Sequence, residues 1–197
     1  MIVSHSDLDH KGGAQALNER FKPAQVFTGR GVELGFEQIS CVEVAPWRWR
    51  GVNFRFVWPP NSAENLNDNN GSCVLLVEFG NTRFLLPGDI EASAEAELVA
   101  RALVNPDAPV NVLVAAHHGS KTSSSQAFID AVAPKHVIFS AGYKNRYGHP
   151  HRTVVQRFEG AAAKLWMTAE HGAVRFSSDG VTVHAFSERE RLARRWF

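Results

Sequence analysis

Cysteine is scarce in this chain, and its scarcity limits the folds that the chain can adopt. Only Cys41 and Cys73 occur among 197 residues, which argues against a fold built on several disulfides. We expect two thiols in the core, and the sequence leaves open whether they ever meet. Net charge is scarce as well, because 21 Lys and Arg residues nearly balance 20 Asp and Glu residues and leave +1. Any affinity for nucleic acid must therefore come from a local patch or from bound metal ions.

Long apolar runs are also absent. No stretch approaches the length of a membrane-spanning helix, and the first residues lack the basic and apolar regions of an export signal. The composition is that of an ordinary globular protein, with 44% hydrophobic residues, 21% charged residues and a mean hydropathy of −0.20. We expect a soluble chain that is cytoplasmic by default.

Hydrophobic periodicity predicts one mixed α/β domain with a sizeable core. The first half of the chain is rich in strand hairpins and the second half alternates helices with strands, an order that suits two packed sheets with helices on the outer faces. We expect strands at residues 25–28, 39–44, 54–58, 73–79, 83–86, 110–115, 135–140, 164–168, 173–176 and 181–185, and helices at 14–21, 91–104, 123–132 and 153–162. A long polar loop rich in asparagine, from 59 to 71, is of the kind that often borders a site.

A dense group of polar side chains lies close to the first residue. The run SHSDLDH at residues 4–10 holds two imidazoles and two carboxylates, and two glycines follow it almost at once. In an extended segment His5, Asp7 and Asp9 share one side, and His10 joins them where the chain turns. This density of ligand groups indicates a metal site.

Three later apolar strands also end in polar side chains. Asp89 follows the strand at 83–86, a pair of histidines follows the strand at 110–115, and further histidines follow the strand at 135–140. Strand ends are where sheets gather their functional groups. The resulting candidates are His5, Asp7, Asp9, His10, Asp89, His117, His118, His149 and His151.

These motifs and their order resemble the metallo-β-lactamase superfamily. The motifs are HxDxDHxGG at residues 5–13, LPGD at 86–89, HHGS at 117–120 and GHPH at 148–151. With the runs NDNNGSCVL at 67–75 and SAGYKNRYGHPH at 140–151, the chain more closely resembles the β-lactamase-like domain at the C-terminus of the ComEC competence proteins, which are DNA-uptake channels. The resemblance covers roughly residues 1–185 and implies a four-layer αββα sandwich, with metals at one edge between the sheets.

The resemblance also assigns roles by position. It implies a first metal site at His5 and Asp7, a second at Asp9, His10 and His118, and a bridging carboxylate at Asp89. The sequence does not fix which of the two adjacent histidines faces the metal.

Further roles follow from the same comparison. His117 would support a ligand or contact phosphate, and His149 would approach the substrate from the opposite rim, with His151 as a weaker candidate. Asp9, His117 and His149 are therefore the candidate catalytic residues.

Two departures from the superfamily pattern affect the choice of metal. Asp7 stands where the superfamily usually has a second histidine, and no histidine occurs between His10 and His117, so the usual third ligand is missing. Asp68 is the nearest substitute by position. A carboxylate in place of an imidazole favours Mn²⁺ or Mg²⁺ over Zn²⁺, although Zn²⁺ stays possible.

A third departure concerns the start of the chain. Members of the family begin with a strand hairpin, and this sequence starts at the last residues of the strand that leads into the opening run. The resemblance therefore implies a domain at 1–185 that lacks its first strands and has an unpaired sheet edge, followed by a charged, helical tail at 186–197.

The implied activity is that of a phosphodiesterase or nuclease. A hydroxide held between two divalent metals would attack phosphorus, and the enzyme would degrade the non-transforming DNA strand during natural transformation. Candidate phosphate contacts are Lys121 and Lys144, and candidate stacking residues for single-stranded DNA are Trp47, Tyr143 and Tyr147. Such a domain would work beside a membrane DNA channel, associated with the membrane or on its periplasmic side.

Two alternatives stay open. One is a Zn²⁺-dependent hydrolase of a lactone, thioester or β-lactam, which is disfavoured because such enzymes normally keep the mid-domain histidine. The other is a truncated, non-catalytic domain that binds DNA or a protein partner.

Overall fold

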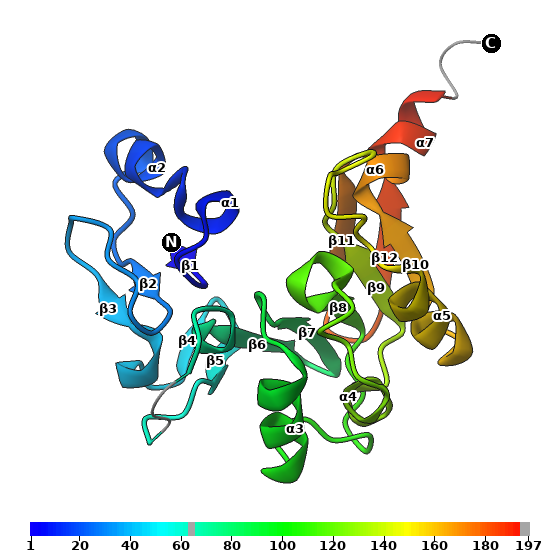
Figure 1. The fold of residues 1–197 in the computed structure, drawn as a ribbon, viewed down its shortest axis with the longest axis horizontal. Coiled ribbons are helices and arrows are strands. Elements are labelled where there is room, and N and C mark those ends of the chain that lie inside the picture. The colour runs from blue at the N-terminus through cyan, green and yellow to red at the C-terminus, as the bar shows by residue number, and fades with distance from the viewer. Residues whose placement is uncertain (63–65, 194–197) are drawn as a thin grey trace.

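The main body of the protein is a sheet of seven strands. A computed structural model describes residues 1–62 and 66–193, and its largest sheet has the strand order β10-β9-β8-β7-β6-β5-β4 (Figure 1). The strands are β4 (Trp47–Trp49), β5 (Val52–Trp58), β6 (Val74–Phe79), β7 (Thr82–Leu86), β8 (Val112–Val114), β9 (His136–Phe139) and β10 (Lys164–Met167). Neighbours are antiparallel from β4 to β7 and parallel from β7 to β10. The parallel half therefore brings the carboxyl ends of successive strands to one edge of the sheet.

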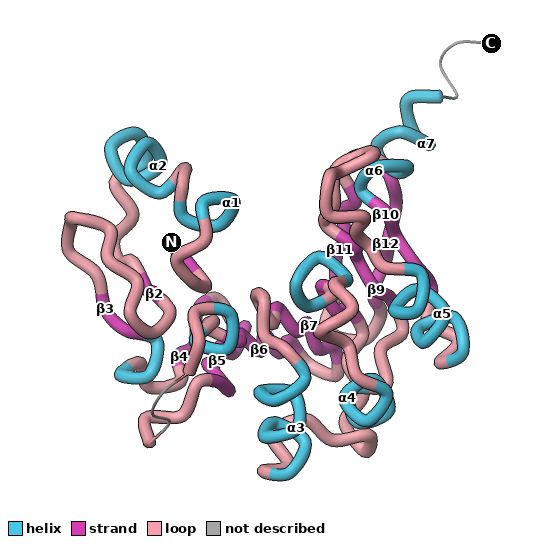
Figure 2. The backbone as a smooth tube through the Cα atoms, in the orientation of Figure 1, coloured by secondary structure: helices cyan, strands magenta, loops and turns pink. Residues whose placement is uncertain are grey.

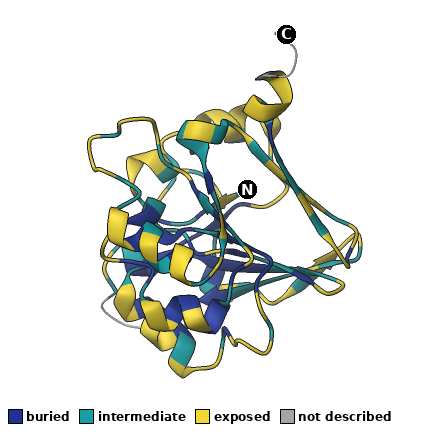
Figure 3. Cartoon of the chain, turned by 90° about the vertical axis from the view of Figure 1, so that its right-hand side faces the viewer, coloured by how far each residue is buried: buried dark blue, intermediate teal, exposed yellow. Residues whose placement is uncertain are grey.

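Three helices cover one side of this sheet. Figure 2 shows α3 (Ala92–Ala100), α4 (Gln126–Val132) and α5 (Arg152–Gly160) beside its strands. Phe128 of α4, Phe139 of β9 and Phe158 of α5 are fully buried and belong to one contiguous apolar cluster, the dark blue interior of Figure 3. This cluster fixes the sheet against the helices, because burying such side chains is the main favourable term in folding.

A smaller sheet is formed by the first third of the chain. Its three parallel strands, β1 (Ile2–Val3), β2 (Phe27–Thr28) and β3 (Ile39–Ser40), lie near α1 (Leu8–Lys11) and α2 (Ala14–Phe21). Phe27 packs against Trp47 and Phe56 of the large sheet, with ring centroids 5.5 and 5.8 Å apart. These aromatic contacts join the two sheets.

A disulfide also joins them. Cys41 lies in the short 3₁₀ turn Cys41–Glu43 after β3, and Cys73 lies just before β6, with their Cα atoms 6.1 Å apart. Both side chains are buried. The expectation of two free thiols was therefore wrong, because the turn after β3 carries Cys41 to the start of a strand of the other sheet.

The C-terminal part adds a two-stranded antiparallel sheet, β11 (Val174–Ser178) and β12 (Val183–Ser187), with α6 (Thr168–His171) and α7 (Glu188–Ala193). The predicted tail at 186–197 thus starts inside β12 and continues as α7, and residues 194–197 lie outside the described part. Among the described residues, no helix is long and apolar enough to span a membrane.

The predicted mixed α/β class, with sheets flanked by helices, is confirmed. The helix at 14–21 has the predicted bounds. The strand expected at 39–44 stops at Ser40 where the 3₁₀ turn begins, and the helix expected at 91–104 stops at Ala100. β1 corresponds to the strand end expected before the opening run, β4 was not predicted, and the described strands form three sheets instead of two.

Candidate metal centre

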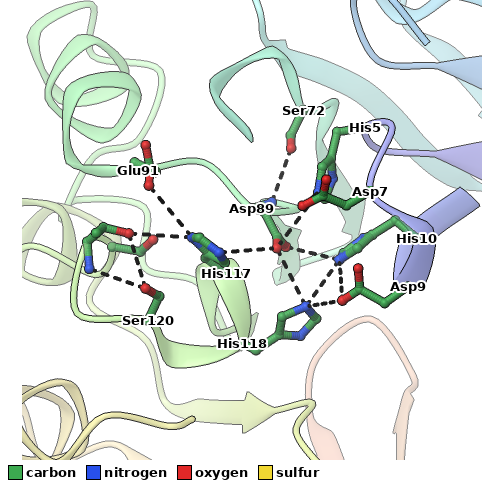
Figure 4. A network of polar contacts seen from close by, with 12 residues as sticks. His5, Asp7, Asp9, His10, Ser72, Asp89, Glu91, His117, His118 and Ser120 are labelled. Atoms are coloured by element: carbon green, nitrogen blue, oxygen red, sulfur yellow. Dashed lines mark hydrogen bonds and ion pairs between the residues drawn. The ribbon is translucent and has the colours of Figure 1, made fainter. Parts of the chain in front are cut away.

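The candidate residues come together where the two sheets meet. The opening loop after β1 faces the loops that follow β7 and β8, which are adjacent parallel strands of the large sheet. Figure 4 shows side chains from the segment after β1, in which Asp9 and His10 lie in α1, and from the two loops after β7 and β8 pointing at one spot. Residues separated by more than 100 positions in sequence thus become neighbours, as happens at the carboxyl ends of parallel strands.

One group of possible ligands consists of His5, Asp7 and Asp68. His5 is fully buried, yet its Nε2 has no hydrogen-bond partner among the residues that the structure describes. This atom lies 3.6 Å from Asp7 Oδ2 and 3.8 Å from Asp89 Oδ2. The Asp68 carboxylate accepts hydrogen bonds from the backbone N–H of Ser6 at 3.2 and 3.3 Å. The structure thus brings Asp68 within reach of His5 and Asp7.

A second group consists of Asp9, His10 and His118. His118 Nε2 lies 3.1 Å from His10 Nε2 and 3.1 Å from Asp9 Oδ2. Asp9 is exposed, whereas both histidine side chains are mostly covered. The group therefore opens to solvent on the side of Asp9.

Asp89 lies between the two groups. Its Oδ1 is 3.3 Å from His10 Nε2, and its Oδ2 is 3.5 Å from His118 Nε2 and 3.8 Å from His5 Nε2. Burial alone would raise the pKa of Asp89, but the hydrogen bond to His10 and the charges of His10, His118 and His5 outweigh it and lower the pKa. Asp89 is thus an ionised, buried carboxylate in contact with both groups.

The protonation of the histidines can be inferred from their outer nitrogens. His118 Nδ1 is 2.8 Å from the carbonyl oxygen of Ser140, which can only accept, so Nδ1 carries the proton and Nε2 is left with a free lone pair. The Ser4 hydroxyl lies 3.1 Å from both His5 Nδ1 and His10 Nδ1. When it accepts from both, their Nε2 lone pairs also face the cluster.

This donor set fits divalent metal ions. Imidazole lone pairs at 3.1 Å repel each other unless a cation lies between them or beside them, and the partnerless Nε2 of buried His5 needs a ligand. The cluster attracts positive charge, since the pKa of His10 is raised: burial would lower it, but the hydrogen bond and the charge of Asp89 outweigh that effect. Outer hydrogen bonds that fix the tautomer are typical of metal-binding histidines.

The two adjacent histidines lie on different sides of Asp89. His118 belongs to the second ligand group, whereas His117 has its Nε2 3.8 Å from Asp89 Oδ2 and its Nδ1 3.4 Å from the hydroxyl of Thr122. Both have left-handed backbone, with φ of 50° and 55°, which is unfavourable for residues other than glycine and is held here by the surrounding structure. This turn directs two consecutive side chains toward one site.

The remaining predicted residues lie further out. The His149 ring stacks on the His118 ring at 6.5 Å, so it borders the cluster, and both burial and the charges of His117 and His118 lower its pKa. Lys121 and Lys144 are exposed. His151 caps α5, with its Nδ1 accepting from the Thr153 N–H.

Trp47 has a packing role. Its ring stacks on Phe54 at 5.1 Å and contacts Phe27 and Phe56. These contacts make it part of the aromatic layer between the sheets.

Sequence reasoning did not single out three residues that support the cluster. Ser4 contacts two histidines, the Ser72 hydroxyl accepts from the Asp89 N–H at 3.1 Å, and Glu91 Oε1 lies 3.9 Å from His117 Nδ1. Each one lies within two residues of a quoted motif or inside it, which is the signal that could have identified them.

Comparison with known proteins agrees with this geometry. The family model described as the metallo-beta-lactamase superfamily matches residues 1–143. The chain belongs to the metallo-beta-lactamase superfamily. Members of this superfamily are metal-dependent hydrolases, which agrees with the ligand groups of the site.

Within the superfamily, the chain is similar to several curated proteins. It is 38% identical to Competence protein ComA of Neisseria gonorrhoeae and 35% identical to Recombination protein 2 of Haemophilus influenzae, in each case over 89% of this chain. It is 30% identical to ComE operon protein 3 of Bacillus subtilis, also over 89%. These alignments cover 25%, 22% and 24% of the relatives, so the chain spans about a quarter of their length.

Two solved structures share the fold of this chain. The metallo hydrolase Igni18 from Ignicoccus hospitalis matches with a TM-score of 0.56 and 13% identity over 94% of this chain and 78% of its own. CmlA, a diiron β-hydroxylase from Streptomyces venezuelae, matches with a TM-score of 0.53 and 13% identity over 84% of this chain and 42% of its own. At these identities the likeness shows the fold alone.

Proposed function

We propose that this domain is a metal-dependent phosphodiesterase that cleaves DNA during natural transformation and degrades the non-transforming strand. The observation that carries the proposal is the pair of ligand groups that meet at Asp89. The similarity to Competence protein ComA and ComE operon protein 3 supports DNA as the substrate.

The composition of the ligand groups favours phosphodiester chemistry with Mn²⁺ or Mg²⁺. Four carboxylates and three imidazoles supply the candidate ligands: His5, Asp7, Asp9, His10, Asp68, Asp89 and His118. Oxygen-rich sites of this kind suit Mn²⁺ and Mg²⁺ better than Zn²⁺. When bound, such ions would activate water and neutralise charge on a phosphoryl group.

The electrostatics of the site support the same conclusion. Four carboxylates gathered at one spot would repel a phosphodiester from the metal-free cluster. Cations at the ligand groups would reverse this, so that the scissile phosphodiester would approach the cluster only in the metal-loaded protein. His117 and His149 line the cluster opposite the opening loop and are placed to donate a proton or a hydrogen bond to a phosphoryl or leaving oxygen.

The disulfide supports a location outside the reducing cytoplasm. Disulfides persist in oxidising compartments, and Cys41–Cys73 ties together the two sheets that build the cluster. We therefore place the domain on the periplasmic or outer side of the membrane, beside the DNA channel.

The test is hydrolysis of bis(4-nitrophenyl) phosphate and of single- and double-stranded DNA by the purified protein with Mn²⁺. We expect cleavage that is lost in Asp89→Ala and His10→Ala and kept in Asp107→Ala, an exposed aspartate outside the cluster. Folded, metal-loaded protein that leaves all three substrates intact would refute the proposal. Two tightly bound Zn²⁺ ions with lactone, thioester or β-lactam hydrolysis would replace it, and failure to bind any divalent ion would leave only a binding role.

A further inference from the structure

A loop beside the candidate metal centre presents aromatic and basic side chains in alternation. It follows β9 and has the sequence Tyr-Lys-Asn-Arg-Tyr at residues 143–147. Tyr143 is 74% exposed and Tyr147 is 66% exposed. Large aromatic side chains at such exposure gain little from packing, and two of them on one short loop leave their ring faces free to contact a ligand.

The loop is connected to the cluster by a column of rings. Tyr147 stacks on His149 with ring centroids 5.8 Å apart and planes inclined by 15°. His149 in turn stacks on His118, with ring centroids 6.5 Å apart and planes inclined by 25°. His118 is a member of the second ligand group, and its Nε2 lies 3.1 Å from Asp9 Oδ2. The Tyr147 ring therefore lies two ring spacings from a candidate metal ligand, and a base stacked on it would lie one spacing further out.

Each tyrosine has a cationic neighbour. The Lys144 ammonium lies 5.3 Å from the ring centroid of Tyr143, and the Arg146 guanidinium lies 4.7 Å from that of Tyr147. The stretch from 131 to 158 contains five Lys and Arg residues and no Asp or Glu. Although the whole chain is nearly neutral, the segment 131–158, which borders the acidic cluster, is therefore locally basic. A surface that binds polyanions needs such a positive charge.

The loop is held in a fixed shape. The Asn145 side chain donates to the carbonyls of Gly142 and His149 at 3.0 and 2.5 Å and accepts from the His149 N–H at 3.0 Å. These bonds keep Lys144 in left-handed backbone, with a φ of 49°, which is unfavourable for lysine. Unfavourable backbone that the surroundings enforce is concentrated at binding and catalytic sites, and a rigid loop loses little entropy on binding.

We propose that the loop from 142 to 149 binds a single-stranded DNA segment, with bases stacked on Tyr143 and Tyr147 and phosphates on Lys144 and Arg146, and so directs the strand to the metal centre. The inference rests on the proposed function and extends it to strand recognition. Alternating rings and cations are how proteins hold single strands without reading sequence. A duplex keeps its base faces stacked inside and offers this loop only phosphates.

The experiment measures binding separately from cleavage. A fluorescein-labelled oligothymidylate of 20 nucleotides is titrated with the protein in the presence of EDTA and followed by fluorescence anisotropy. We expect Kd to rise roughly 5- to 150-fold in Tyr147→Ala and in Tyr143→Ala, and to change much less in Tyr147→Phe, which keeps the ring.

A matched control exists on another part of the surface. Trp49 is 62% exposed and has the Arg50 guanidinium 5.3 Å from its ring centroid, so Trp49→Ala removes an equivalent aromatic–cation pair outside the loop. We expect it to bind the oligonucleotide as the wild type does. An abasic oligonucleotide of the same length should bind the wild type and Tyr147→Ala equally, because only the stacking differs.

Three outcomes would overturn the inference: unchanged Kd in the double variant of Tyr143 and Tyr147, an equal loss in Trp49→Ala, or duplex DNA bound as tightly as the single strand. If these tests succeed while bis(4-nitrophenyl) phosphate is not hydrolysed with Mn²⁺, the proposed activity fails and the binding loop stands.

Discussion

Removing the Cys41–Cys73 disulfide tests whether the contact between the small and the large sheet holds the metal cluster together. The bond links residues 32 positions apart, and closing a loop of that length in the unfolded chain corresponds to about 3.7 kcal/mol of stability at 25 °C. For a chain of this size, that loss lowers Tm by about 7 to 15 °C. We expect this shift in the double variant Cys41→Ser/Cys73→Ser relative to the oxidised wild type, measured by thermal and urea denaturation.

Metal binding should weaken in the same variant. His5 and His10 lie in the segment that follows β1 of the small sheet, whereas Asp89 and His118 follow strands β7 and β8 of the large sheet. The disulfide lies close to this segment, because the backbone N–H of Cys73 donates to the carbonyl of Ser4 at 3.0 Å. A looser joint separates the two halves of the ligand set, so calorimetry should show a higher Kd for Mn²⁺. Reductant should reproduce both effects in the wild type and change nothing in the double variant. A change in unfolding free energy below about 1 kcal/mol, or unchanged Mn²⁺ affinity, would refute this reasoning.

Three further predictions concern single side chains. Ser4→Ala removes the hydroxyl that orients two histidines, and by analogy with other residues that support metal ligands it should weaken Mn²⁺ binding about 10- to 100-fold in calorimetry without unfolding the protein. Burial raises the pKa of Glu95 above its ordinary 4.5 and outweighs the hydrogen bonds from Ser124 and Ser125. Between the two pKa values the folded state binds more protons, so the unfolding free energy of the wild type should fall as pH rises through that window, and urea titrations of Glu95→Gln should lack this slope. Phe128→Ala empties a fully buried position and should cost about 3 to 5 kcal/mol in urea denaturation, against less than about 0.5 kcal/mol for the exposed Gln126→Ala.

Much of the architecture is visible in the sequence because hydrophobic periodicity is strong where elements are buried. The helix at 14–21 and the strands around 73–79 and 83–86 follow that signal closely. β4 was missed because it has only three residues, which is too few for a hydrophobic period to be recognised. The disulfide depends on how two sheets dock, which spacing along the chain does not encode.

The candidate site likewise has a part that the sequence predicts and a part that only the folded chain reveals. Polar groups at the ends of apolar strands indicate which segments meet, since strand ends of one sheet share an edge. The structure brings Asp89 and His118 to such an edge of the large sheet, and His5 reaches them from the small sheet. Which of His117 and His118 joins the second ligand group depends on their backbone, because both residues have the left-handed conformation. Nothing in the sequence signals this conformation. Asp68 was predicted only as a substitute by position, because its approach to His5 depends on the path of a long loop.

The central claim is that two ligand groups sharing Asp89 hold two divalent ions in this chain. Titration of the metal-free protein with Mn²⁺ in a calorimeter tests it most directly. The account predicts two ions per chain in the wild type, one ion in Asp68→Ala, and strongly weakened binding of both ions in Asp89→Ala. A wild type that binds one ion or none, or an Asp89→Ala variant that still binds two with unchanged affinity, would contradict it.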